Sequence, residues 1–238
     1  FSQQFEEPHH FNQAVLLAVE AQLDPAALTA AVRLLVQHHD ALRLRYAGVG
    51  AAATQSCAPD DESVTVQVLD LSSVPGSDAT RIMQSQAAET QASLGLAHGP
   101  LMRVVWFDRG SGRDGRLLLV IHHLAVDGVS WRILLEDLEA AYAQARRGET
   151  IRLAPKTTSF QCWADRLAAH ARTESVQQQR SYWQGLPRAI PLPRDVYSQP
   201  NSVASAQCIE VTLDTDETRA LLQEIPSVYR TEINDLLL

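Results

Sequence analysis

The chain has 238 residues, of which 45% are hydrophobic and 20% are charged, so it can bury a substantial core in one or two domains. Its formal net charge is -8 and its only lysine is Lys156, which argues against nucleic-acid binding. No apolar run approaches the roughly 20 residues of a membrane span. Cys57, Cys162 and Cys208 lie far apart, without metal or disulfide spacing. We therefore expect a cytoplasmic protein without membrane or nucleic-acid partners.

Hydrophobic periodicity predicts separated strands and helices along the whole chain. Asp24 and Pro25 form a typical helix start, an N-cap followed by a proline at the first helical position. Strands are expected at residues 11–21, 42–46, 64–68, 101–107, 116–122 and 207–213, and helices at 25–42, 77–94, 131–147, 159–173, 177–185 and 216–224. Residues 48–58 should form a loop, and 186–193 an extended, proline-rich segment. This order predicts an α/β fold, an α+β sandwich with a mixed β-sheet flanked by helices.

The segment from Ile121 to Trp131 carries the clearest chemical signal. A buried strand brings two adjacent histidines to its end, a loop turns on an Asp-Gly pair, and a helix begins. Such a junction combines a titratable imidazole with the free N–H groups of a helix start. It is suited to acid/base chemistry on a carbonyl compound.

Neighbouring strand side chains point to opposite faces, so only one of His122 and His123 should face a site while the other packs into the protein. Asp127 has three interpretations: a helix N-cap, a turn residue, or a carboxylate paired with an arginine. Gly128 is expected to provide a tight turn. Trp131 is expected in the core, with a pocket wall as the alternative.

Several other chemistries find no support in the sequence. It contains no phosphate-binding glycine loop, no Gly-x-Ser-x-Gly motif and no plausible zinc quartet. Lys156 lies in a loop-like stretch and is a poor candidate for a pyridoxal Schiff base. Any chemistry at an amino-acid α-carbon would therefore be free of cofactor and metal.

Residues 122–134, with the sequence HHLAVDGVSWRIL, resemble the His-His-x-x-x-Asp-Gly motif of the condensation-domain superfamily of nonribosomal peptide synthetases. This superfamily shares the fold of chloramphenicol acetyltransferase. The tail after Asp-Gly is similar specifically to the epimerization branch. Residues 8–17, 38–46, 159–164, 182–183 and 231–238 also resemble family segments, in the same order.

The resemblance implies inversion of an L-aminoacyl or L-peptidyl thioester, which the phosphopantetheine of a peptidyl carrier protein presents, with no cofactor bound to the domain itself. It makes His123 the acid/base residue, with His122 orienting the loop and Asp127 structural, paired with Arg43. We add the hypothesis that the helix start at Ser130 and Trp131 faces the site and stabilises developing negative charge.

The family has two lobes of the same fold, and the resemblance assigns residues 1–186 to the N-terminal lobe and 187–238 to the crossover and the start of the second lobe. The apolar end of the sequence suggests a piece of a longer chain. The glutamate that partners the histidine in the family would lie in the second lobe. We therefore expect the second lobe, the carrier protein and neighbouring synthetase domains as partners, and an isolated fragment to be inactive.

Three alternatives stay open from the sequence. A condensation domain would use the same histidine for an attacking amine and form an amide bond. A coenzyme-A-dependent acyltransferase of the same fold is a second possibility. The third is an inactive lobe that only docks a carrier protein.

Overall fold

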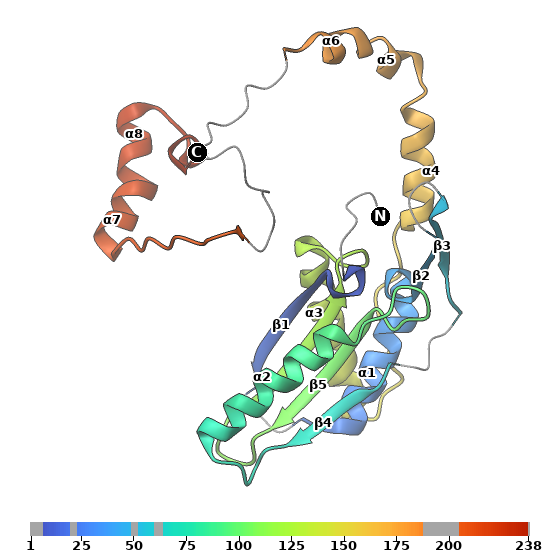
Figure 1. The fold of residues 1–238 in the computed structure, drawn as a ribbon, viewed down its shortest axis with the longest axis vertical. Helices are drawn as coiled ribbons and strands as arrows, with labels where there is room; N and C mark the ends of the chain where they lie inside the picture. Colours follow the sequence, from blue (N-terminus) through green and yellow to red (C-terminus); the bar gives the residue numbers. More distant parts are fainter. Residues whose placement is uncertain (1–6, 20–22, 49–51, 60–63, 188–204, 238) are drawn as a thin grey trace. The chain divides into compact units, whose positions relative to one another are not determined.

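The computed structural model describes residues 7–19, 23–48, 52–59, 64–187 and 205–237 (Figure 1). The chain divides into two compact units, Phe1–Arg180 and Ser181–Leu238. Every strand among the described residues lies in the first unit. The lobe boundary expected between residues 186 and 187 stays a prediction.

The first unit is built on a four-stranded mixed sheet with the order β1-β6-β5-β4. Its strands are β1 (Asn12–Val19), β4 (Val66–Asp70), β5 (Met102–Asp108) and β6 (Gly115–His122). β6 pairs antiparallel with both β1 and β5, whereas β4 runs parallel to β5. The parallel pair is connected through helix α2 (Gly76–Ala92), because parallel neighbours require a crossover connection. The predicted α/β fold with a mixed sheet flanked by helices is confirmed.

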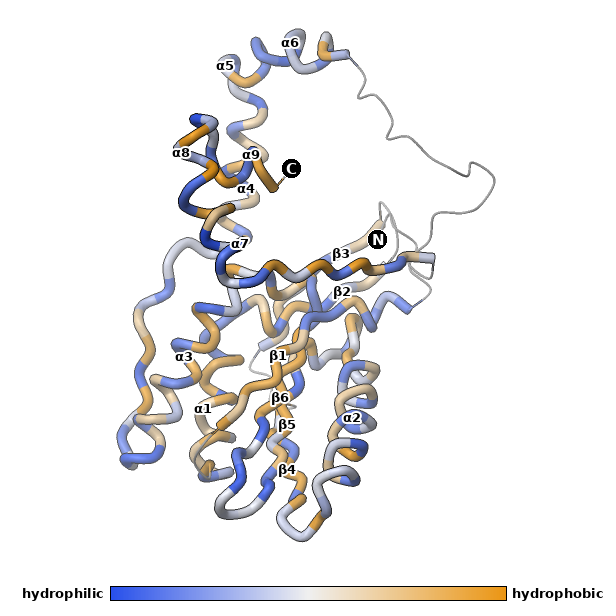
Figure 2. The backbone as a smooth tube through the Cα atoms, turned by 90° about the vertical axis from the view of Figure 1, so that its left-hand side faces the viewer, coloured by the Kyte–Doolittle hydropathy of each residue, from blue (hydrophilic) through white to orange (hydrophobic). Residues whose placement is uncertain are grey.

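Helices cover both faces of this sheet (Figure 2). Helices α1 (Pro25–His38) and α3 (Gly128–Arg146) pack on one face, and α2 packs on the other. The side chains of β6 point alternately to the two faces of the sheet. Leu117, Leu119 and Ile121 pack in the cluster with α1 and α3, and Leu118 and Val120 pack in the cluster with α2. β6 is therefore the apolar centre of the unit.

Helix α1 begins as expected, with the Asp24 carboxylate accepting the N–H groups of Ala26 and Ala27. It ends at His38, earlier than predicted, and a 3-10 turn over Asp40–Arg43 leads into β2 (Leu44–Ala47). Its buried residues recur at helical spacing and form the face toward the sheet: Ala27, Leu28, Ala31, Val32, Leu35 and Val36.

Two expectations about strands are wrong. The predicted loop at 48–58 contains β3 (Thr54–Cys57), which pairs antiparallel with β2. All four residues of β3 are exposed, so no alternation of apolar residues marks it. Residues 207–213 do not form the predicted strand. A strand needs a neighbouring strand to accept and donate its backbone hydrogen bonds, and no described residue pairs with this segment. Most of the segment 186–193 lies outside the described residues.

The remaining helices agree in part with the sequence pattern, which predicts helices at 159–173, 177–185 and 216–224 but none at Ile225–Tyr229. They are α4 (Phe160–His170), α5 (Glu174–Gln177), α6 (Arg180–Gly185), α7 (Thr215–Arg219), a π-helical turn over Ala220–Glu224, α8 (Ile225–Tyr229) and α9 (Ile233–Leu237). No described helix combines the length and the apolar character needed to cross a membrane.

Gly115 and Gly128 provide a test of this packing. A Cβ on Gly115 would lie 1.9 Å from the buried Trp106 ring, whereas a Cβ on Gly128 would meet nothing within 4 Å. We expect Gly115→Ala to lower the free energy of unfolding by about 1–3 kcal/mol through overpacking. Gly128→Ala, the matched control, should leave it unchanged or raise it, because alanine favours helix. Urea unfolding of both variants makes the comparison, and equal stabilities would contradict the packing of Gly115 under Trp106.

Candidate functional site

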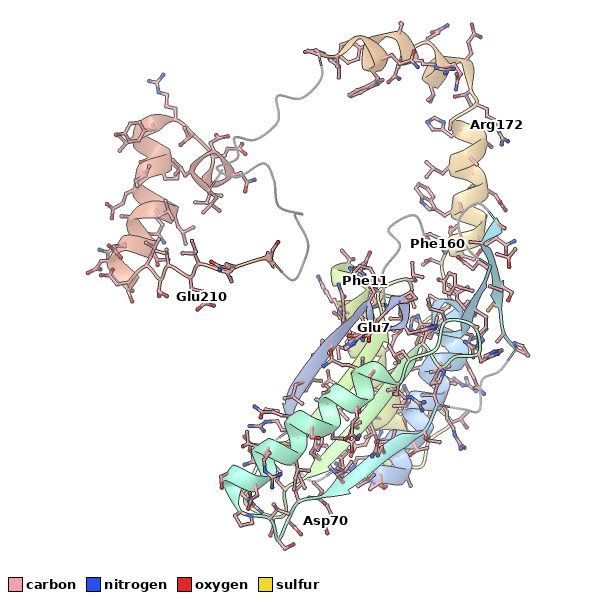
Figure 3. All side chains as sticks on the ribbon, in the orientation of Figure 1. Glu7, Phe11, Asp70, Phe160, Arg172 and Glu210 are labelled. Carbon is pink, nitrogen blue, oxygen red and sulfur yellow. The ribbon has the colours of Figure 1, made fainter. Side chains whose placement is uncertain are left out.

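The candidate site lies where β6 ends and α3 begins. β6 ends at His122, residues 123–126 form the loop, and Asp127 is the N-cap of α3. Phe11, which precedes β1, lies at this end of the sheet, opposite to Asp70 at the end of β4 (Figure 3). The Phe11 carbonyl accepts the backbone N–H of His123 at 2.9 Å, so the start of β1 and the histidine loop are joined directly.

His122 is a buried structural residue with 1% of its surface exposed. Its Nδ1 accepts the backbone N–H of Leu124 at 3.1 Å, so Nε2 carries the proton and donates it to the Pro8 carbonyl at 2.8 Å. Burial holds the pKa of His122 below its usual value. A neutral ring with both nitrogens occupied cannot exchange protons with a substrate, and His122 instead fixes the loop.

His123 has the geometry of a base. Its Nδ1 lies 2.9 Å from the Val126 carbonyl oxygen, which only accepts, so Nδ1 carries the proton and Nε2 keeps its lone pair. The Phe11 ring stacks on the imidazole at a centroid distance of 4.9 Å. The side chain is neither buried nor fully exposed. The expectation that the two histidines face different surroundings is confirmed.

Gln13 completes the arrangement and was missed by the sequence analysis. Its Oε1 accepts the indole N–H of Trp131 at 2.8 Å, and because an indole only donates, this bond fixes which end of the amide faces which partner. The amide nitrogen then lies 3.2 Å from His123 Nε2 and donates to it. Its position in the sequence could have identified it, because Gln13 is a polar residue on the face of β1 that otherwise carries the core residues Val15 and Leu17.

Trp131 belongs to the core, as expected, with 9% of its surface exposed and contacts in the cluster between α1, α3 and the sheet. Its ring packs while its N–H reaches Gln13. One side chain therefore anchors α3 to the sheet and orients the amide beside His123.

Asp127 caps helix α3. Its carboxylate accepts the Ser130 backbone N–H at 2.8 Å and the Ser130 hydroxyl at 2.6 Å. These bonds hold the pKa of Asp127 below its usual value, the hydroxyl bond contributing most. Because an anion already occupies this helix start, the hypothesis that the helix start at Ser130 and Trp131 stabilises substrate charge gains no support from this geometry.

The expected pairing of Asp127 with Arg43 is wrong for the described part of the chain. Arg43 donates to the Val36 and Gln37 carbonyls at 2.8 and 2.5 Å, and to the Asp40 carboxylate at 2.8 Å. Its Nε donates to the Ala58 carbonyl, which follows β3. The last carbonyls of α1 lack helical partners, so they attract this guanidinium. Arg43 therefore ties the end of α1 to the β2–β3 hairpin.

Gly128 does not provide a tight turn, contrary to expectation. It is the first residue of α3, its φ is not in the left-handed region, and a Cβ there would enter open space. The change of direction is made by Asp127, whose backbone is extended and whose side chain caps the helix.

His38, His39 and Asp137 form the one group among the described residues whose ligand-type atoms all lie within 4.8 Å of one another. His39 Nε2 lies 2.8 Å from an Asp137 carboxylate oxygen, which links α1 to α3. Burial nevertheless holds the pKa of His39 below its usual value and outweighs the neighbouring carboxylate. This group tightens the helix pair on one face of the sheet.

Comparison with known proteins identifies the class to which this fold and site belong. The sequence model of the Condensation domain family matches residues 1–238, and the chain belongs to this family. One of the linear gramicidin synthase proteins of Brevibacillus parabrevis is 46% identical over the whole chain, which spans 5% of that protein. Surfactin synthase subunit 2 of Bacillus subtilis strain 168 is 37% identical, again over the whole chain, which spans 7% of it.

Two solved structures bear on the fold. The epimerization domain from the third module of a tyrocidine synthetase matches with a TM-score of 0.83 and 35% identity, over 100% of this chain and 53% of that one. The first condensation domain of the calcium-dependent antibiotic synthetase matches with a TM-score of 0.63 and 23% identity, over 77% of this chain and 44% of that one. The chain is thus a condensation-superfamily domain of the nonribosomal peptide synthetase type, and it spans about half of the solved epimerization domain.

The two histidines with lowered pKa predict a pH-dependent stability. Below about pH 6.5 the unfolded chain binds protons at His39 and His122 that the folded protein excludes. The free energy of unfolding therefore decreases as the pH is lowered. Each group contributes at most about 1.4 kcal/mol per pH unit. Urea unfolding between pH 7.5 and 5.5 tests this, and His122→Gln, which keeps one donor and one acceptor, should flatten the slope. A stability that rises on acidification would contradict the buried neutral state.

The capping role of Asp127 predicts a graded response. Asp127→Ala removes the acceptor for the Ser130 N–H and should lower the free energy of unfolding by about 1 kcal/mol. Asp127→Ser keeps an acceptor oxygen and is the matched control, with most of the stability retained. Thermal unfolding of both variants distinguishes them, and equal losses would mean that the carboxylate acts through something other than the cap.

Proposed function

We propose that this chain is the N-terminal lobe of an epimerization domain that converts an L-aminoacyl or L-peptidyl thioester on a carrier protein to the D form. The observation that carries the proposal is the state of His123. Its Nδ1 proton is held by the Val126 carbonyl, which leaves the lone pair of Nε2, the acceptor of the Gln13 amide, as the base. His122 cannot take this role, because its side chain is buried and its two nitrogens are bound to the Pro8 carbonyl and the Leu124 N–H.

The proposed reaction uses His123 as the base. A thioester acidifies its α-carbon only modestly, so a positioned base is needed. His123 Nε2 takes the α-proton, and the electron pair of the broken C–H bond delocalises onto the thioester oxygen. The partner of His123, which we assign below to the second lobe, then gives a proton to the opposite face of the α-carbon, and His123 releases the proton it took. The phosphopantetheine arm belongs to the substrate and arrives with the carrier protein, so the chain itself binds no resident cofactor.

The same base could serve an attacking amine in a condensation domain, and similarity favours epimerization. The likeness to the tyrocidine synthetase epimerization domain extends over the whole chain at 35% identity. The likeness to the condensation domain of the calcium-dependent antibiotic synthetase covers 77% of the chain at 23% identity, which supports the fold alone. The residues after Asp127-Gly128 also resemble the epimerization branch.

The proposal assigns the remaining chemistry to a second lobe. The chain covers 53% of the solved epimerization domain, so a comparable length of that domain has no counterpart here. We propose that the second lobe supplies the partner of His123 and that the carrier protein and neighbouring synthetase domains deliver and remove the thioester. Residues 1–238 alone are then expected to be inactive.

The decisive experiment uses the complete domain with its carrier protein, loaded with an L-aminoacyl or L-peptidyl thioester in heavy water. We expect deuterium to enter the α-position together with mixing of L and D forms. His123→Ala should abolish both, by at least a factor of about 100, because general base catalysis contributes that much or more. Mass spectrometry of the released acid and chiral chromatography measure the two quantities.

The other outcomes select the alternatives. An amide product, formed once an acceptor carrier is supplied and without α-exchange, would make the domain a condensation domain. Acyl transfer from coenzyme A would indicate the acyltransferase. If the domain binds the carrier protein but shows neither α-proton exchange nor product with any of a panel of thioesters, it is an inactive lobe that only docks the carrier.

A further inference from the structure

Deprotonation of a thioester needs a second group besides the base. The electron pair of the broken C–H bond accumulates on the carbonyl oxygen, and a hydrogen-bond donor at that oxygen lowers the barrier. The donor must lie close to the base, because the carbonyl oxygen and the α-carbon are separated by only two bonds. The start of helix α3 is a poor source, since Asp127 already accepts the Ser130 N–H there.

The Gln13 amide nitrogen is a donor in the required place, 3.2 Å from His123 Nε2. Trp131 holds the other end of the amide, so the nitrogen cannot exchange places with Oε1 without losing the 2.8 Å indole bond. Within the described part of the chain, the second N–H of Gln13 has no hydrogen-bond partner. Gln13 also comes from the sheet, on the strand that pairs with β6, which fixes its backbone relative to the histidine loop.

We propose that Gln13, oriented by Trp131, is a catalytic residue that donates a hydrogen bond to the thioester carbonyl oxygen of the substrate; this inference rests on the proposed epimerization. In the free protein the amide donates to the lone pair of His123 Nε2. When substrate arrives, its α-proton must approach that lone pair, and the carbonyl oxygen replaces Nε2 as the acceptor of the amide. The donor thereby meets the enolate oxygen as its charge develops.

Three variants of the complete domain test the assignment. Gln13→Met removes the donor and keeps the length of the side chain, and Trp131→Phe removes the hydrogen bond that orients the amide while keeping an aromatic ring. Gln86→Met makes the same substitution on helix α2, on the other face of the sheet, and is the control. The rate of α-deuterium uptake is measured for each variant with the carrier-bound thioester.

We expect Gln13→Met to lower kcat by about 100-fold to 1000-fold, the loss typical of one oxyanion donor, with little change in KM. Trp131→Phe should lower kcat by a smaller factor, and Gln86→Met should leave it unchanged. A second readout is the infrared stretch of a ¹³C-labelled thioester carbonyl, recorded in the inactive His123→Ala background. Donation from Gln13 should shift this band to lower frequency, and Gln13→Met should remove the shift.

The possible failures are distinguishable. If the wild-type domain exchanges its α-proton and Gln13→Met does so at the same rate, the assignment of Gln13 is overturned while the proposed function stands. A loss confined to KM, with the carbonyl band unmoved, also overturns it, since Gln13 would then only shape the site. If the wild-type domain shows no exchange but forms an amide, the proposed function fails and this inference fails with it.

Discussion

The structure depends on the position of β6 as the central antiparallel strand, paired with β1 on one side and β5 on the other. Its side chains are buried alternately against α1 and α3 and against α2, so both faces of the strand specify its register. A slip by one residue would exchange the surroundings of His122 and His123. The apolar run from Leu117 to Ile121 therefore determines which of the two histidines is buried and which is presented.

The short loop after β6 is held by bonds that leave little freedom. His122 accepts the Leu124 N–H, the Val126 carbonyl accepts the Nδ1–H of His123, and the Asp127 carboxylate caps α3. The Val126 carbonyl thus orients the imidazole of His123, and the side chain of the next residue, Asp127, caps helix α3. This explains why a histidine and an aspartate four residues apart occur together: the aspartate starts the helix at a distance that places a carbonyl against the imidazole.

The order of the elements and the opposite orientation of the two histidines could be predicted, because both follow from local periodicity. The partners of Arg43 could not, since they are carbonyls at the end of α1 and after β3 that carry no signal in the sequence. β3 was missed for a related reason, as its exposed residues show no apolar alternation. Gln13 lies 110 residues from His123, and only the pairing of β1 with β6 brings the two together.

The chemical character of the groups around His123 suits a reaction in which a cation and an anion form together. In the proposed epimerization, His123 becomes an imidazolium as it takes the proton while the thioester becomes an enolate. A lysine or arginine beside Nε2 would stabilise the enolate but oppose the imidazolium, and a carboxylate would do the reverse. A neutral amide, held by a neutral indole, donates to the oxygen without placing a net charge beside the ring. The structure thus places a neutral donor beside His123, the proposed base, and keeps the carboxylate of the motif, Asp127, bound to Ser130 at the helix start.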